Sequence, residues 1–220
     1  MRRGEPRTGE GSRGEEGGYA HPYMVAVPAT PPPFVSRVER VAAADLPYSW
    51  HRGCPVGPAQ LRRVQLRYIG FDGKPHAGQL VVNATVVRDV VVVFRTLYSA
   101  RFPIRQMRPI DAFHGSDDRS AAADNTSAFN CRRAVANGPT SWSMHAYGEA
   151  IDVNDVENPY FVGPRVIPPA GAAYRNRADV RPGMAVESGV LVRAFAGVGW
   201  GWGGRWAGSP DYQHFSSNGR

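Results

Sequence analysis

The stretch that decides the fold is residues 63–97, which read RVQLRYIGFDGKPHAGQLVVNATVVRDVVVVFRTL. Residues 63–68 alternate polar and apolar side chains, as a half-buried strand does, and residues 78–82 predict a second strand after the FDGK turn. Residues 83–97 then place apolar side chains three or four positions apart, which predicts a helix with Asn83 as its N-cap. The valine run would also suit a buried strand, so the helix is the favoured of two interpretations.

Outside this stretch, residues 104–110 predict a further strand and residues 182–196 a further helix. Short strands interleaved with helices indicate the α+β class. Residues 1–33 are rich in Gly, Arg, Glu and Pro and lack any helical or strand period, so we expect a disordered lead-in. The remaining residues 34–220 are expected to form a single domain.

The chain of 220 residues carries a formal net charge of +7, and its basic residues are concentrated in one part. Residues 52–108 hold nine arginines and Lys74 against only Asp72 and Asp89. Such a surface could attract nucleic acid, anionic lipid or an acidic wall polymer, or simply be solvated. No basic helix or RNA-binding aromatic motif is present, so we expect no nucleic-acid partner. No apolar run approaches the roughly 18 residues of a transmembrane segment.

Cys54 and Cys131 are the only cysteines, which excludes a zinc site built from four cysteines. Two distant cysteines favour one disulfide and therefore an oxidising compartment. The alternative is that each is a buried, small apolar residue. The Met1 end is polar and charged, so no secretory signal is visible in this sequence.

The first chemical motif is residues 143–154, which read SMHAYGEAIDVN. Residues 150–154 alternate, so Ile151 and Val153 should face the core while Asp152 and Asn154 face a cleft. His145 precedes Asp152 across a Tyr-Gly-Glu turn, and an imidazole and a carboxylate are suitable zinc ligands. Taken alone, this spacing also fits a structural histidine and a turn aspartate.

The second motif is residues 199–215, which read GWGWGGRWAGSPDYQHF. A catalytic zinc commonly has three protein ligands and an open position, and His214 would be the third ligand. Asp211 should then lie on a turn before the strand of His214, close enough to the metal to act as general base. Asp111 and His114 have the same spacing, but they lie in a Gly, Ser and Asp-rich stretch that predicts an exposed loop.

The two motifs together resemble the M15 family of zinc peptidases, which contains D-alanyl-D-alanine carboxypeptidases and L-alanyl-D-glutamate endolysins. SMHAYGEAID matches the family's S-x-H-x-x-G-x-A-x-D signature, and DYQHF matches its acidic-x-x-His ending, over a resemblance that covers about residues 46–215. It implies a small single α+β domain with a mainly antiparallel sheet and flanking helices, as in the hedgehog signalling domain. It also implies Zn²⁺ held by His145, Asp152 and His214, with Asp211 as the catalytic acid–base residue.

The resemblance further implies an arginine that holds the substrate carbonyl or carboxylate, for which Arg132 is the best match. The other candidates are Arg133, Arg119 and Arg105. Ser143 matches the signature serine and is expected to line the substrate site. The implied function is a monomeric zinc peptidase of bacterial peptidoglycan stem peptides, extracellular or bound to the cell wall, and most simply a D-alanyl-D-alanine carboxypeptidase. The alternatives are an L-alanyl-D-glutamate endopeptidase and a non-catalytic, hedgehog-like binding domain stabilised by zinc.

Overall fold

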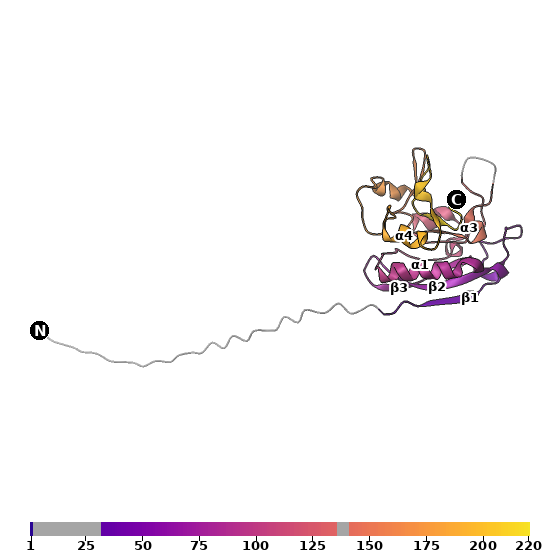
Figure 1. The fold of residues 1–220 in the computed structure, drawn as a ribbon, viewed down its shortest axis with the longest axis horizontal. Coiled ribbons are helices and arrows are strands. Elements are labelled where there is room, and N and C mark those ends of the chain that lie inside the picture. Colours follow the sequence, from indigo (N-terminus) through magenta and orange to yellow (C-terminus); the bar gives the residue numbers. More distant parts are fainter. Residues whose placement is uncertain (2–31, 136–140) are drawn as a thin grey trace. The chain divides into compact units, whose positions relative to one another are not determined.

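The computed structural model of the protein describes Met1, residues 32–135 and residues 141–220. The described residues from 32 onward form one compact unit of short antiparallel sheets and helices (Figure 1). The predicted α+β class is thus confirmed. Most of the expected lead-in, residues 2–31, lies outside the described residues. Within the described part, no helix is long and apolar enough to cross a bilayer.

The larger sheet contains β1 (Ser36–Arg40), β2 (Leu61–Ile69) and β3 (Pro75–Asn83) in the order β1-β2-β3. All of its strands are antiparallel, and β2 pairs with β3 along its whole length. The connecting turn is closed by a hydrogen bond of 2.8 Å from the Gly70 amide to the Lys74 carbonyl. The predicted hairpin is therefore present, with both strands longer than expected from the alternation.

Helix α1 (Val87–Ser99) follows the hairpin directly, after a 3₁₀ turn at Ala84–Val86. The Asn83 side chain accepts a hydrogen bond of 3.2 Å from the Thr85 amide, so it caps this turn rather than α1, whose N-cap position is Val86. Val90, Phe94 and Leu97 are buried on one side of α1, whereas Val92 is 43% exposed. This one-sided burial is that of an amphipathic helix, so the strand interpretation of the valine run is wrong.

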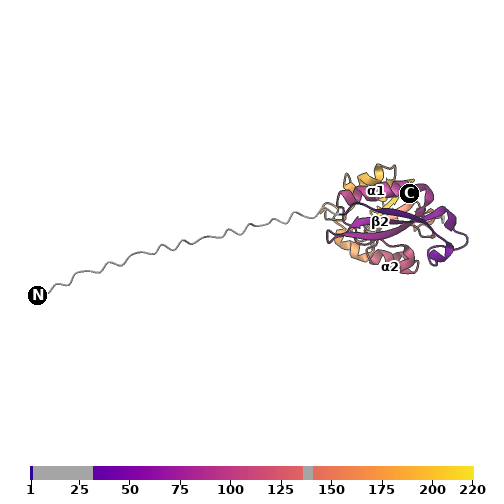
Figure 2. The ribbon, with the colours of Figure 1, turned by 90° about the horizontal axis from the view of Figure 1, so that it is seen from below.

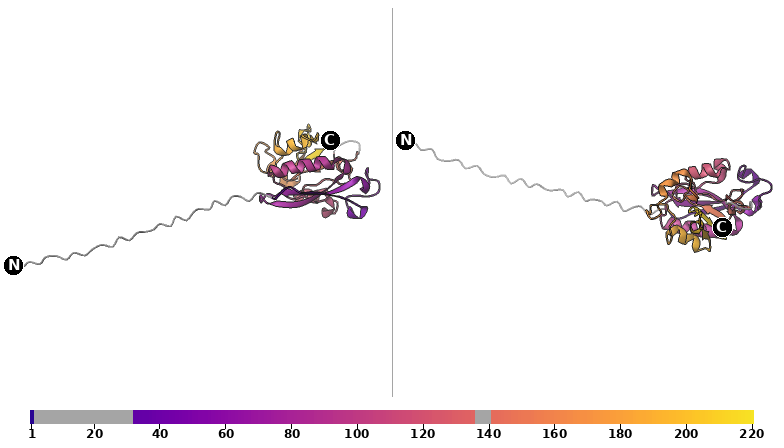
Figure 3. Two further views of the ribbon diagram at one scale, coloured as in Figure 1. Left: turned by 60° about the horizontal axis from the view of Figure 1, so that its bottom comes forward. Right: turned by 90° about the horizontal axis from the view of Figure 1, so that it is seen from above.

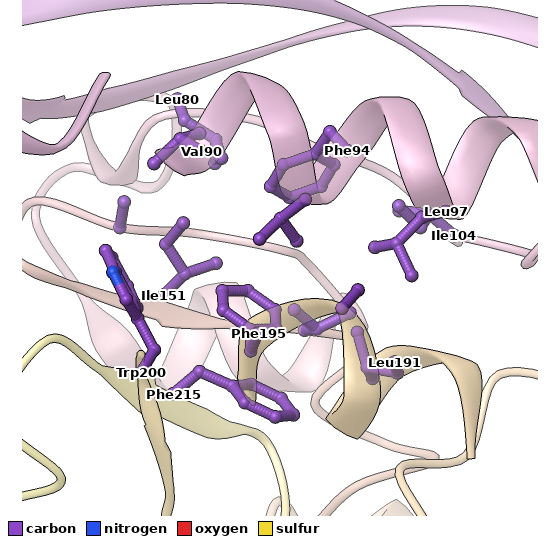
Figure 4. Packing of buried hydrophobic residues seen from close by; sticks show 14 of the residues in the cluster. Leu80, Val90, Phe94, Leu97, Ile104, Ile151, Leu191, Phe195, Trp200 and Phe215 are labelled. Atoms are coloured by element: carbon purple, nitrogen blue, oxygen red, sulfur yellow. The ribbon is translucent and has the colours of Figure 1, made fainter. Parts of the chain in front are cut away.

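A second small sheet lies on the other side of α1 and contains β4 (Ala150–Asp152), β8 (His214–Ser216) and β7 (Gly201–Trp202), in that order. Helix α4 (Val190–Ala196) packs against α1, and the views in Figures 1 and 3 place α1 between the larger sheet and α4. Phe195 stacks on Phe215 with ring centroids 4.1 Å apart. The main core therefore joins the larger sheet, both helices and the small sheet (Figure 4).

The remaining elements are short. They comprise two helices, one hairpin and five 3₁₀ turns: α2 (Asp117–Ala122), α3 (Met144–Tyr147), β5 (Tyr160–Val162) with β6 (Arg165–Ile167), and turns at Ala43–Asp45, Pro58–Gln60, Ile110–Phe113, Pro169–Tyr174 and Gly203–Arg205. In the view from below, α1 and α2 are seen on opposite sides of β2 (Figure 2).

Two predicted elements differ from the structure. Residues 104–110 do not form a strand, because their buried side chains recur every third residue. Pro103 precedes the segment and Pro109 lies within it, and only isolated bridges form nearby. The helix predicted for residues 182–196 begins only at Val190. Positive φ angles at Gly183 (85°) and Ser188 (61°) prevent an earlier helical start.

A disulfide joins Cys54 to Cys131, with Cα atoms 5.8 Å apart, so the predicted pairing is present. It lies beside a second, smaller apolar cluster that contains Leu61, Val81 and Phe129. Because Cys131 immediately precedes Arg132, the crosslink fixes the main chain next to this candidate substrate-binding residue.

Candidate metal centre

His145 is presented by the short helix α3. The Ser143 side chain caps this helix by accepting a hydrogen bond of 3.3 Å from the His145 amide. The helix ends at Gly148, whose φ is 70°, and a Cβ atom there would lie 2.7 Å from the Asn83 main-chain nitrogen. Glycine is therefore required for the turn that leads from His145 back into β4.

Asp152 and His214 are direct cross-strand neighbours of β4 and β8. Opposite residues of an antiparallel pair project from the same face, so the carboxylate and the imidazole meet without any loop adjustment. Both residues are buried, as is His145. Asn154, in contrast, does not face the cleft: its φ is 50°, and its side-chain amide donates to the carbonyls of Pro103 and Gly183. The prediction that Asn154 shares a face with Asp152 is wrong.

The three side chains converge on one point. His145 Nε2 lies 3.1 Å from Asp152 Oδ2, His214 Nδ1 lies 3.1 Å from Asp152 Oδ1, and the two nitrogens are 3.2 Å apart. Ligands about 2.0–2.1 Å from one tetrahedral ion would be about 3.3 Å from each other. The spacing of these donor atoms is therefore suited to a shared zinc ion.

The other ring nitrogen of each histidine is already engaged. His145 Nδ1 donates to the Ala128 carbonyl over 2.6 Å, and His214 Nε2 donates to a main-chain oxygen of Arg220 over 3.1 Å. Because such oxygens only accept, these bonds leave His145 Nε2 and His214 Nδ1 as lone-pair donors in the neutral imidazoles. Two lone pairs and a carboxylate then face one another, an arrangement that needs a cation at its centre. The residues fit a divalent metal.

Burial opposes ionisation of Asp152, but the adjacent imidazoles of His145 and His214 hold its pKa below the ordinary range. The carboxylate is thus available as an anionic ligand. The described residues contain one further cluster of candidate ligand atoms, formed by His51, Cys54 and Cys131. Its two sulfurs are joined in the disulfide, so that cluster offers no thiolate to a metal.

Asp211 lies next to this group, on the turn that enters β8, as predicted. It forms an isolated bridge with Tyr160, and its Oδ1 is buried without a hydrogen-bond partner among the described residues. Burial raises the pKa of Asp211 to about 7, and the negative charge of Asp152 adds to the shift. A carboxyl with this pKa can both take and return a proton near neutral pH.

A cavity of about 990 Å³ is lined by His145, Asp152, His214 and Asp211. Of the other side chains predicted from the sequence to belong to the site, some line this cavity and others do not. Ser143 and Arg132 line the cavity, and Arg132 forms an ion pair with Asp117. The other candidate arginines do not line it: Arg133 stacks on Trp142 at 3.8 Å, and Arg105 bonds to Asp124 over 3.1 Å.

His114 is also outside the cavity lining. It follows the 3₁₀ turn Ile110–Phe113 with a φ of 55°, is exposed, and packs edge-on against Tyr48. Asp111 instead accepts hydrogen bonds from the Tyr48 and Ser49 amides. The competing Asp-x-x-His pair is thus a surface turn, as its composition predicted.

Several lining residues carried no signal in the sequence. Tyr160 and Arg165 come from the β5–β6 hairpin, Asp155 from the turn after β4, and Gln213 from the turn before β8. Trp206, from the Trp and Gly-rich run of the second motif, also lines the cavity. The others depend on how irregular segments fold, which residue spacing does not reveal.

Comparison with known proteins agrees with the motifs. A family model described as D-alanyl-D-alanine carboxypeptidase, of the M15 peptidases, matches residues 136–217, a segment that contains all three candidate ligands and Asp211. No curated protein and no solved structure matches the chain significantly. The part of the chain that forms the candidate metal centre is therefore similar to the D-alanyl-D-alanine carboxypeptidase family of M15 peptidases.

Proposed function

We propose that this peptidase is zinc-dependent and removes the terminal D-alanine from peptidoglycan stem peptides that end in D-alanyl-D-alanine. The observation that carries the proposal is the meeting of three buried donor atoms, from His145, Asp152 and His214, whose spacing and hydrogen bonds suit one divalent cation. These three residues would hold the zinc. When bound, zinc would act as a Lewis acid on the scissile carbonyl and lower the pKa of a bound water toward about 7.

Asp211 is the proposed general base and acid. Its carboxylate takes a proton from the attacking water as the water oxygen bonds to the carbonyl carbon. The same proton passes to the nitrogen of the leaving amine as the carbon–nitrogen bond breaks. The unpartnered Oδ1 and the raised pKa of Asp211 support this role, because neither is explained by a structural contact.

Arg132 is proposed to bind the free carboxylate at the end of the substrate. It is the only one of the four candidate arginines that lines the cavity, and a guanidinium binds a carboxylate through two parallel N–H donors. Its ion pair with Asp117 holds the side chain toward the cleft. A cation placed for a terminal carboxylate favours a carboxypeptidase over the L-alanyl-D-glutamate endopeptidase alternative.

The non-catalytic, hedgehog-like alternative is less well supported. A structural zinc site is commonly closed by a fourth protein ligand, and Cys54 or His114 would have to supply it. Cys54 is paired in the disulfide, and His114 is exposed and outside the cavity lining, so neither is available. An open fourth position beside Asp211 is what hydrolysis requires.

We also propose that the protein works outside the cytoplasm, at the bacterial cell wall where its substrate lies. The disulfide supports this location, because such bonds persist in oxidising compartments.

The test is mass analysis of acetyl-L-Ala-γ-D-Glu-L-Lys-D-Ala-D-Ala after incubation with the purified protein. We expect release of one D-alanine, loss of activity with a chelator, and recovery with Zn²⁺. In Asp211→Asn, kcat should fall by about 10²–10⁴-fold while zinc content is retained. Turnover that is insensitive to chelator contradicts the metal assignment. Cleavage between L-Ala and D-Glu would instead establish the endopeptidase.

A further inference from the structure

The cleft differs in charge from the protein that contains it. The whole chain has a formal net charge of +7, yet six carboxylate side chains line the cavity against three arginines. The carboxylates belong to Asp117, Asp118, Glu149, Asp152, Asp155 and Asp211, and the arginines are Arg132, Arg165 and Arg220. An acidic cleft in a basic protein favours a ligand that carries positive charge.

Most of the acidic groups in the cleft already have a described contact or a proposed role. Asp152 contacts both histidines, Asp117 pairs with Arg132, and Glu149 accepts a hydrogen bond of 2.9 Å from the Ser217 hydroxyl. Asp211 is the proposed base. Asp155 is different, because it is only 3% exposed and its Oδ1 has no hydrogen-bond partner in the part of the chain that the structure describes.

Asp155 is held in this position by its neighbours. The Asn154 side chain bonds to the Pro103 carbonyl over 2.9 Å, and the Val156 amide donates to Asp124 Oδ1 over 2.9 Å. The Asn158 amide donates to the Asn154 carbonyl over 2.9 Å and closes the turn. With the main chain on both sides anchored, the Asp155 side chain remains directed at the cavity that it lines.

The cleft contains a second unused acceptor. Gln213 Oε1 is buried without a hydrogen-bond partner among the described residues, and Gln213 also lines the cavity. A buried oxygen without a donor is costly to the folded protein, so two of them in one cleft point to a ligand that brings N–H groups. A second metal ion is not supported, because no cluster of three candidate ligand atoms in the described residues includes Asp155.

We propose that Asp155, with Gln213 as a further acceptor, binds a primary ammonium group of the peptide substrate. An ammonium offers three N–H donors and a positive charge, which match a carboxylate and an amide oxygen. This inference rests on the proposed function, since the diamino acid of a stem peptide adjoins the D-alanyl-D-alanine end. It adds a substrate requirement: the side-chain amine of that residue has to be free.

The electrostatics of Asp155 agree with a site that is completed by a cation. Burial, and the negative charges of Asp152 and Asp124, raise the pKa of Asp155 well above its ordinary value. Without a ligand, the ionised form of Asp155 is therefore disfavoured relative to the protonated form. A bound ammonium would stabilise the ionised form.

The experiment is calorimetric titration of the zinc-loaded Asp211→Asn variant with two peptides. One is acetyl-L-Ala-γ-D-Glu-L-Lys-D-Ala-D-Ala, and the other is the same peptide acetylated on the lysine Nε. We expect the free amine to bind at least about tenfold more tightly. Adding Asp155→Asn should bring the two affinities within about twofold of each other. Asp179→Asn, which removes a charge from an exposed residue outside the cavity, should preserve the preference.

Thermal unfolding separates binding from a structural role. Asp155→Asn removes a buried carboxyl without a partner, so Tm should stay the same or rise. A fall of several degrees, equal affinities for the two peptides, or a preference that survives Asp155→Asn would each overturn the inference. If the wild-type protein prefers the free amine but hydrolyses neither peptide, the ammonium site stands and the proposed peptidase activity fails.

Discussion

The first and second halves of the folded region use burial in opposite ways. In residues 34–108, the buried side chains are nearly all apolar, and Ser49 and Asn83 are the only buried polar residues. In residues 109–220, the buried set includes His145, Asp152 and Asp211 together with many other polar groups. The first half is a scaffold stabilised by hydrophobic burial, whereas the second gives up part of that stabilisation to hold reactive groups away from water.

The largest expected effect is a loss of bound zinc. It tests whether the metal ligands all lie in the second half of the folded region. His214→Ala removes one of three proposed ligands, so bound zinc should fall from about one ion per chain to well below half. Turnover should drop by at least about a thousandfold, because the Lewis acid contributes several kcal/mol. Elemental analysis and the peptide assay measure the two effects.

The matched control is His114→Ala, which changes the other Asp-x-x-His histidine. His114 is exposed and outside the cavity, so zinc content and turnover should equal those of the wild type. If His114→Ala lost zinc and His214→Ala kept it, the two histidines would have been assigned the wrong way round.

The scaffold is tested by Phe94→Ala. Phe94 is 1% exposed and packs between the larger sheet and the second half of the core (Figure 4). Its truncation should lower the free energy of unfolding by about 3–5 kcal/mol, measured in urea, while kcat per folded molecule stays unchanged. If Phe94→Ala instead lowered kcat and kept the wild-type stability, the first half would contribute to catalysis and not only to stability.

The pH dependence of stability should reveal the cost of burying Asp211 in metal-free protein. Burial raises its pKa to about 7 in the folded state, well above the ordinary value of an aspartate, so the folded protein binds this proton more tightly than the unfolded chain. Stability is therefore lost as pH rises from about 4 to 7, by an amount on the order of a few kcal/mol.

Asp211→Asn should remove that loss. In the presence of chelator, the variant should have a higher Tm than the wild type at pH 8, and the two should have the same Tm near pH 4. A lower Tm of Asp211→Asn at pH 8 would mean that the carboxylate makes a stabilising contact, contrary to its unpartnered Oδ1.

The smallest effect separates two adjacent arginines at the edge of the cleft. Arg132→Ala should raise KM for a D-alanyl-D-alanine peptide by about tenfold to a hundredfold, because a charge-assisted contact with the terminal carboxylate is lost. Arg133→Ala is the comparison, since Arg133 stacks on Trp142 but does not itself line the cavity. Steady-state kinetics that reverse the order of the two variants would assign the carboxylate to Arg133.

Regular periodicity explains which parts of the fold were predictable. The hairpin and α1 follow from alternation and helical spacing in residues 63–97, and the structure confirms both. The strand predicted for residues 104–110 is wrong, because apolar residues alone do not distinguish a strand from an irregular segment that packs against the core. The late start of α4 depends on positive φ angles at Gly183 and Ser188, which apolar spacing does not encode.

The candidate site was predictable only where its residues share a motif. His145, Asp152 and His214 were placed together by two segments, and the structure brings these side chains within 3.2 Å of one another. Tyr160 and Asp155 were not predicted, because the β5–β6 hairpin places Tyr160 in the cavity wall and the turn after β4 places Asp155 there. Their positions depend on hydrogen bonds between distant segments, such as that of Asn154 to Pro103, which no local pattern reveals.

The most direct test of the central claim is anomalous diffraction at the zinc edge from crystals of the zinc-loaded protein. The account predicts one strong peak, bound by His145 Nε2, an oxygen of Asp152 and His214 Nδ1, with Asp211 close by but not a ligand. A peak elsewhere, no peak at this site, or a fourth protein ligand that closes it would contradict a catalytic zinc centre.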